Sequence, residues 1–163
     1  MPNTHYVGKA GQFAVMAELA FRGYNVAIPE IDVGDDVFVL NDQNVQLTRI
    51  QVKTSTGRKQ PRDGSYRCQF LIKLAHVHAA AMYAVHYVLA GRCGKRWRFL
   101  VLDRAVLSEL ISSGWGTQAT RGTHMLSVVF IDSDQARTST RDDATDLSRH
   151  LGNWRAWPLV TRP

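Results

Sequence analysis

Two short stretches in the N-terminal half of the chain have the patterns of β-strands: the first is a β-branched and aromatic run that begins on an acid, and in the second apolar and polar residues alternate. The first stretch is residues 36–40, D-V-F-V-L, and the second is residues 46–54, Q-L-T-R-I-Q-V-K-T. Between them, residues 41–44 (N-D-Q-N) supply side chains that favour turns. This pattern predicts a β-hairpin, and the strongest candidate chemistry of the chain lies on it.

The rest of the chain alternates between helical and strand-like patterns. Apolar residues at three- and four-residue steps predict helices over residues 8–22, 74–82, 103 or 104 to 111, and 143–151. Runs of β-branched and aromatic residues predict strands over residues 24–31, 66–73, 85–89, 97–102 and 126–131. Residues 55–65 and 114–124 are expected to be loops, and residues 132–140 a linker. We expect a single α/β domain over residues 1–163, with a core over about 8–132 and a C-terminal helix and tail over about 141–163.

The hairpin predicts which polar side chains meet. The start of its first strand lies beside the end of its second, so Asp36 is expected next to Gln51 and Lys53, whose side chains leave the strand on one face. A hard divalent cation prefers oxygen ligands, and the Asp36 carboxylate, the Gln51 side-chain carbonyl and the Val52 backbone carbonyl provide three. Lys53 would orient the attacking water or stabilise transition-state charge in phosphodiester hydrolysis. The alternative is an ordinary amphipathic hairpin with solvated polar ends.

The charge of the chain favours a polyanionic partner. Twenty Lys and Arg against fourteen Asp and Glu give a formal net charge of +6. Three cations, Arg58, Lys59 and Arg62, fall in the loop that follows Lys53, where they would contact a nucleic-acid backbone or simply be solvated. Lys9 lies between two glycines at the expected start of the first helix, where free backbone amides could also contact a phosphate.

Other features narrow the class of protein. No apolar run is long enough for a membrane span, and no signal peptide is recognised, so we expect a cytoplasmic protein without a membrane partner. The two cysteines, Cys68 and Cys93, fall on predicted strands without a metal-binding spacing, which favours reduced thiols in the core.

An ordered set of motifs resembles the PD-(D/E)xK nuclease superfamily, in particular the branch with Mrr-like enzymes and archaeal Holliday junction resolvases. The matching segments are residues 8–12 (G-K-A-G-Q), 22–24 (R-G-Y), 32–36 (D-V-G-D-D) and 50–54 (I-Q-V-K-T). The resemblance implies a restriction-endonuclease-like mixed sheet with flanking helices, DNA as substrate, Mg²⁺ or Mn²⁺ as cofactor, and in many members a homodimer.

The resemblance also implies site residues. Asp36, Gln51 and Lys53 stand at the positions of the catalytic motif, with Gln51 as the QxK variant of its acidic residue. Gln12 stands where the helix of the family usually carries a glutamate, and Glu18 on the same helix is an alternative to it. Because two amides replace two carboxylates, a catalytically impaired module that binds nucleic acid or a protein is the competing hypothesis, and an unrelated basic α/β domain is a third.

Overall fold

The computed structural model describes residues 4–30, 34–41, 46–79, 85–131, 134–139 and 144–154. The elements in the first part of the chain are α1 (Thr4–Phe21), β1 (Asn25–Ala27), β2 (Val37–Asn41), β3 (Gln46–Thr56), β4 (Arg58–Lys59), β5 (Tyr66–Lys73) and α2 (Leu74–His78). The elements in the second part are β6 (Val85–Cys93), β7 (Arg96–Asp103), α3 (Arg104–Ser112), β8 (Thr117–Thr120), β9 (Thr123–Ile131), β10 (Gln135–Thr138) and the short 3₁₀ helix η1 (Ser148–His150). Within these residues no helix is both long and apolar enough to cross a membrane.

The strands form two sheets. Sheet A has the order β1-β2-β3-β6-β7 and is mixed, because β3 and β6 run parallel while its other neighbours are antiparallel. Sheet B has the order β10-β9-β5-β4, with β8 also paired to β9, and is antiparallel throughout. The predicted hairpin is confirmed, since β2 pairs antiparallel with β3 and Val37 lies opposite Ile50.

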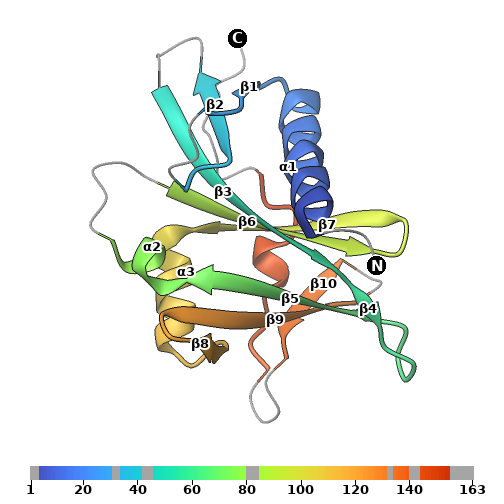
Figure 1. Ribbon diagram of the computed structural model, residues 1–163. Helices are drawn as coiled ribbons and strands as arrows, with labels where there is room; N and C mark the ends of the chain where they lie inside the picture. The colour runs from blue at the N-terminus through green and yellow to red at the C-terminus, as the bar shows by residue number, and fades with distance from the viewer. Residues whose placement is uncertain are drawn as a thin grey trace.

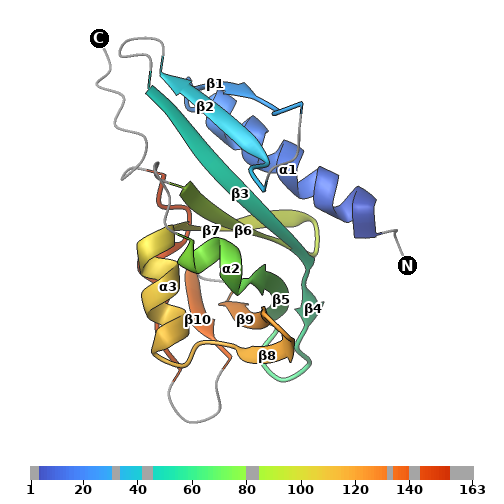
Figure 2. The same ribbon diagram turned by 60° about the vertical axis from the view of Figure 1, so that its left-hand side comes forward.

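Three layers result from this arrangement, as Figures 1 and 2 show: α1 lies on one side of sheet A, and sheet B lies on the other. Val15 and Leu19 of α1 pack on Val37, Ile50 and other apolar side chains on the near face of sheet A. A second apolar cluster, which includes Phe70, Leu89 and Phe130, fills the space between the sheets. The expected mixed α/β fold is therefore present, although its strands divide between two sheets.

Helix α1 approaches β3 closely at one glycine. A Cβ atom added at Gly11 would lie 2.0 Å from Thr54 Oγ1, whereas a Cβ at Gly8 would meet no atom within 4 Å. The helix begins at Thr4, four residues earlier than the predicted start, so both glycines lie inside it. The expectation that they flank free backbone amides at the helix start was wrong; Gly11 instead permits the close packing.

Several predicted elements differ from the structure. The expected loop over 114–124 contains β8, and the expected linker over 132–140 contains β10. In place of a helix over 143–151, Asp146 forms a bridge with Arg137 and only η1 is helical. The predicted hairpin turn at 42–44 and the tail beyond Trp154 lie outside the described residues.

Candidate functional site

The backbone of the hairpin fixes Asp36 at the point where β2 begins. Gly34 turns the chain with a φ of 101°, and the Asp36 amide then donates to the Ile50 carbonyl at 2.8 Å. The Asp36 carboxylate accepts a hydrogen bond from the backbone N–H of Val52 at 2.7 Å (Oδ2). Because this acceptor is held by the main chain of β3, the carboxylate has a defined position beside the strand.

Helix α1 reaches the same place with two side chains. Gln12 is buried, 5% exposed, and its Nε2 donates to the backbone carbonyl of Asp36. Lys9, one turn earlier, donates from Nζ to Gln12 Oε1 at 2.8 Å. Both the donor and the acceptor of the Gln12 amide are therefore hydrogen-bonded. A glutamate at this position would have no N–H to donate to the backbone carbonyl of Asp36.

A cavity of about 360 Å³ brings these groups together with Lys53. His5, Lys9 and Gln12 line it from α1, and Asp36, Val52 and Lys53 line it from the hairpin. The structure thus places the Asp36 carboxylate and the Lys53 side chain at one hollow. Two ammonium groups face one carboxylate there, so the cavity favours an anion such as a phosphate.

Two of the predicted site residues are not brought into this cavity. Gln51 is 6% exposed, lies in register with Tyr87 of β6 and is not among the lining residues. Glu18 forms an ion pair with Arg22 at 2.6 Å on α1 and is also not among the lining residues. Spacing along β3 placed Gln51 near Asp36, whereas Glu18 was the alternative to Gln12 on the helix and is engaged by Arg22.

The oxygen atoms of the cavity suit a hard divalent cation, but the protein supplies few of them as ligands. Within the described residues no group of three or more His, Cys, Asp or Glu is placed to hold a metal. Asp36 supplies one carboxylate, and the Val52 carbonyl leaves β3 on the side of its N–H, which faces Asp36. Mg²⁺ is commonly held by one or two carboxylates together with waters and substrate phosphates, so this set fits Mg²⁺ that binds together with a phosphate.

A second hollow of about 360 Å³ lies farther along β3. Basic side chains that were expected in a loop line it. Arg58 and Lys59, which form β4, line it together with Arg67 and Gln69 of β5. Arg62 is exposed in the turn between β4 and β5 and is not among the lining residues. Arg67 and Gln69 were missed because nothing in the sequence shows that β4 pairs with β5.

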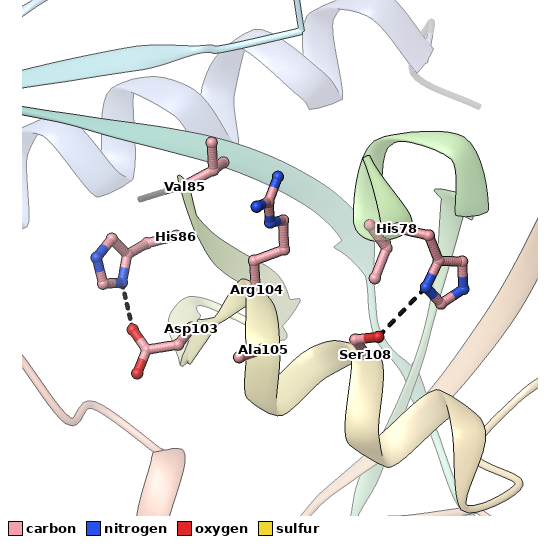
Figure 3. A pocket seen from close by; sticks show the side chains of 8 residues that line it. His78, Val85, His86, Asp103, Arg104, Ala105 and Ser108 are labelled. Carbon is pink, nitrogen blue, oxygen red and sulfur yellow. Dashed lines mark hydrogen bonds and ion pairs between the residues drawn. The ribbon is translucent and has the colours of Figure 1, made fainter. Parts of the chain in front are cut away.

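A third cavity, of about 530 Å³, lies between α2, α3 and the start of β6 and was also missed. Figure 3 shows its two side-chain contacts: His86 Nδ1 lies 2.7 Å from Asp103 Oδ1, and Ser108 Oγ lies 3.3 Å from His78 Nδ1. Burial lowers the pKa of His86 below its usual value, although the solvent-exposed Asp103 carboxylate acts in the opposite direction. The contact between His86 and Asp103 joins the start of α3 to β6.

Comparisons with known proteins agree with the fold. No protein-family model and no curated protein matches this chain. The solved structure of a bacterial homing endonuclease, I-Ssp6803I, is similar to it with a TM-score of 0.58 and 16% sequence identity, over 96% of this chain and 91% of that one. At this identity the similarity shows the fold, so the chain has a nuclease-like mixed α/β fold.

Proposed function

We propose that this protein is a metal-dependent endonuclease of the PD-(D/E)xK class that hydrolyses DNA phosphodiester bonds. The observation that carries the proposal is the cavity in which the Asp36 carboxylate, Val52 and the Lys53 side chain come together beside α1. The similarity in fold to a homing endonuclease supports the same class of substrate.

Each residue of the cavity has a role that follows from its chemistry. Asp36 and the Val52 carbonyl would hold Mg²⁺ or Mn²⁺, which when bound activates water and offsets charge on the phosphate. The Lys53 ammonium would stabilise the additional negative charge of the transition state and keep the attacking water in place. Lys9, held by Gln12, would contact a phosphate next to the scissile one.

Cations outside the cavity would hold the nucleic acid. Arg58 and Lys59 extend the positive surface along β3, and Arg62 is exposed in the adjoining turn. Phosphate contacts of this kind position a duplex and release counterions, so binding should weaken as salt rises. We expect two copies of the chain to act together when both strands are cut.

A second function, binding without cleavage, is favoured by a specific observation. Gln12 replaces a carboxylate, and its amide is hydrogen-bonded to both Asp36 and Lys9. Only one carboxylate then remains in the cavity against two ammonium groups. A site with so few negative ligands binds a divalent cation weakly, and such a protein would retain DNA without hydrolysing it.

One experiment distinguishes the two functions. Supercoiled plasmid and branched DNA are incubated with the protein in Mg²⁺, Mn²⁺ or chelator, and cleavage and binding are both followed. Asp36→Asn keeps an acceptor for the Val52 N–H but removes the charge, and Lys53→Met removes the ammonium. Each is expected to lower the cleavage rate by about 10²–10³-fold or more. Lys95→Ala, in the exposed turn between β6 and β7, is the control and should cut normally.

The endonuclease and the binding module predict different results in this experiment. Cleavage that needs a divalent cation and is lost in both variants supports the endonuclease. Salt-sensitive binding without any cleavage supports the binding module instead. Gln12→Glu adds a test of the metal: if Asp36 holds a cation, the second carboxylate should lower the Mg²⁺ concentration required for half-maximal cleavage. An unchanged Mg²⁺ dependence would mean that the new carboxylate does not reach the cation.

A further inference from the structure

The outer face of sheet B carries polar and basic side chains in a regular arrangement. Along β5, Cys68, Phe70 and Ile72 point into the apolar cluster between the sheets, and the alternate residues are exposed. Arg67 and Gln69 are two of the exposed residues. Because strand residues alternate, these two side chains leave the same face of the sheet.

The strand register places three arginines in one row across this face. Arg58 of β4 lies opposite Arg67 of β5, Arg67 lies opposite Val129 of β9, and Val129 lies opposite Arg137 of β10. Val129 is only 3% exposed although it belongs to the outer row, as expected if the arginine stems cover it. The five strands β4, β5, β8, β9 and β10, all within the described residues, contain no Asp or Glu. The strands themselves therefore add no acid to this face. Acids approach it at Arg137, where Asp146 lies opposite in a β-bridge and Asp63 interacts electrostatically.

This face is continuous with the catalytic cavity. Thr54 lines the cavity, and the next two residues of β3, Ser55 and Thr56, line the hollow that contains Arg58 and Arg67. Ser55 Oγ also accepts a hydrogen bond from the backbone N–H of Gln69 at 3.1 Å. A ligand that lies in the cavity and extends along β3 therefore meets the outer face of sheet B.

We propose that this face determines DNA sequence preference, with Arg67 and Gln69 contacting base edges in the major groove of a duplex whose scissile phosphate lies beside Asp36. The inference rests on the proposed function. Arginine pairs with the two acceptors of guanine, and glutamine with the donor and acceptor of adenine. Arg58 and Arg137 contact the phosphates on either side.

Dimensions support a duplex as the ligand. Alternate residues of a strand are about 6.8 Å apart, which is two base-pair steps, so Arg67 and Gln69 reach different base pairs. Three strand spacings separate Arg58 from Arg137, about 14 Å, which is close to the width of the major groove of B-DNA, about 12 Å. The deep, narrow major groove of A-form RNA would not admit these side chains, so double-stranded RNA is a poorer fit.

The test is selection of preferred sites from a library of randomised duplexes in chelator, where no cleavage takes place. Wild-type protein should enrich a defined sequence. Arg67→Ala and Gln69→Ala should each relax the preference at one or two base pairs, about 10- to 100-fold in discrimination, and Arg67→Lys should relax it as well because a lysine cannot make the bidentate contact. Arg58→Ala should weaken binding to all sequences alike and reduce the salt dependence.

Arg22→Ala is the matched control, because Arg22 is an exposed arginine at the end of α1, which lies on the other side of sheet A from sheet B. It should leave the preference unchanged, and melting curves should show that every variant is folded. A preference that survives both Arg67→Ala and Gln69→Ala, or the absence of any preference in the wild type, would overturn the inference. Sequence preference without cleavage in Mg²⁺ would uphold it while refuting the hydrolase, so the two failures are distinguishable.

Discussion

The contact between α1 and β3 predicts opposite effects of one substitution at two glycines of the same helix. At Gly11, a new Cβ would lie 2.0 Å from Thr54 Oγ1 and 2.6 Å from its Cγ2, closer than real contacts allow. At Gly8 the same Cβ would meet nothing within 4 Å. Both glycines are helical, so alanine gives each the same gain in helix propensity and only the packing differs.

The size of each effect on the free energy of unfolding follows from helix propensity and packing. Gly8→Ala should raise the free energy of unfolding by up to about 1 kcal/mol. Gly11→Ala gains the same propensity but forces overpacking, which costs about 1–3 kcal/mol. Because its clash is severe, we expect a net loss near 2 kcal/mol. The two variants should then differ by about 3 kcal/mol, or about 6–12 °C in Tm for a chain of this size.

Chemical denaturation of both variants measures the difference, and Thr54→Ala tests its origin. Removing Oγ1 and Cγ2 of Thr54 leaves only its Cβ, 2.8 Å from the added atom, so the double variant Gly11→Ala/Thr54→Ala should recover part of the loss. Gly11→Ala should also impair cleavage, since α1 carries Lys9 and Gln12. Equal stability of Gly8→Ala and Gly11→Ala would refute the packing of α1 on β3.

Three further predictions concern buried polar groups. Because burial lowers the folded-state pKa of His86, the unfolded chain binds more protons as pH falls below about 6.5, so Tm should decrease in acid and His86→Gln should reduce that decrease. Cys68 is fully buried in the apolar cluster between the sheets, so Ellman's reagent should not label it in folded Cys93→Ser protein, where it is the remaining cysteine. Arg49→Met leaves the mostly buried Asp35 without its partner at 2.8 Å and should lower the unfolding free energy by about 3 kcal/mol in denaturant titrations.

Each of these has a contradicting result. A Tm slope between pH 7 and 5 that is the same in wild type and His86→Gln would exclude His86 as its source. Rapid labelling of Cys68 under native conditions would show that the space between the sheets opens readily. If Asp35→Asn does not restore stability to the Arg49→Met protein, the loss does not come from an unpaired carboxylate.

Local patterns were sufficient to predict the central hairpin and several single elements. The β-branched and aromatic run over 36–40 and the alternation over 46–54 predicted the two strands, and their antiparallel pairing places Asp36 beside Val52 and Lys53 as expected. The strand over 66–73 was predicted with its observed bounds, and its burial alternates along its length. In these segments one buried face fixes the register, so periodicity carries most of the information.

Pairing between distant segments was not predictable in the same way. β5 pairs with β9, more than fifty positions later in the chain, and no period in the sequence reports which strand will be its neighbour. β8 and β10 are short and polar, so their composition resembled loops although both pair with β9. For the same reason the sequence indicated one sheet where the protein has two.

The candidate site was predicted only as far as the hairpin extends. Gln12 was placed near Asp36 through motif resemblance and Lys9 was expected to contact a phosphate at the helix start; the structure brings both to the cavity. Gln51 was placed beside Asp36 by spacing along β3; it is buried in register with Tyr87 of β6 and is not among the residues that line the cavity.

Substitutions at the buried and at the exposed residues of β5 have different consequences for the evolution of the protein. Its inward residues pack in the apolar cluster, so truncating one of them would lower the free energy of unfolding by about 2–5 kcal/mol. Its outward residues touch solvent, and surface substitutions of this kind usually change stability by less than about 0.5 kcal/mol. New target sequences could thus be acquired by drift at positions such as Arg67 and Gln69, while the chemistry at Asp36 and the fold remain untouched.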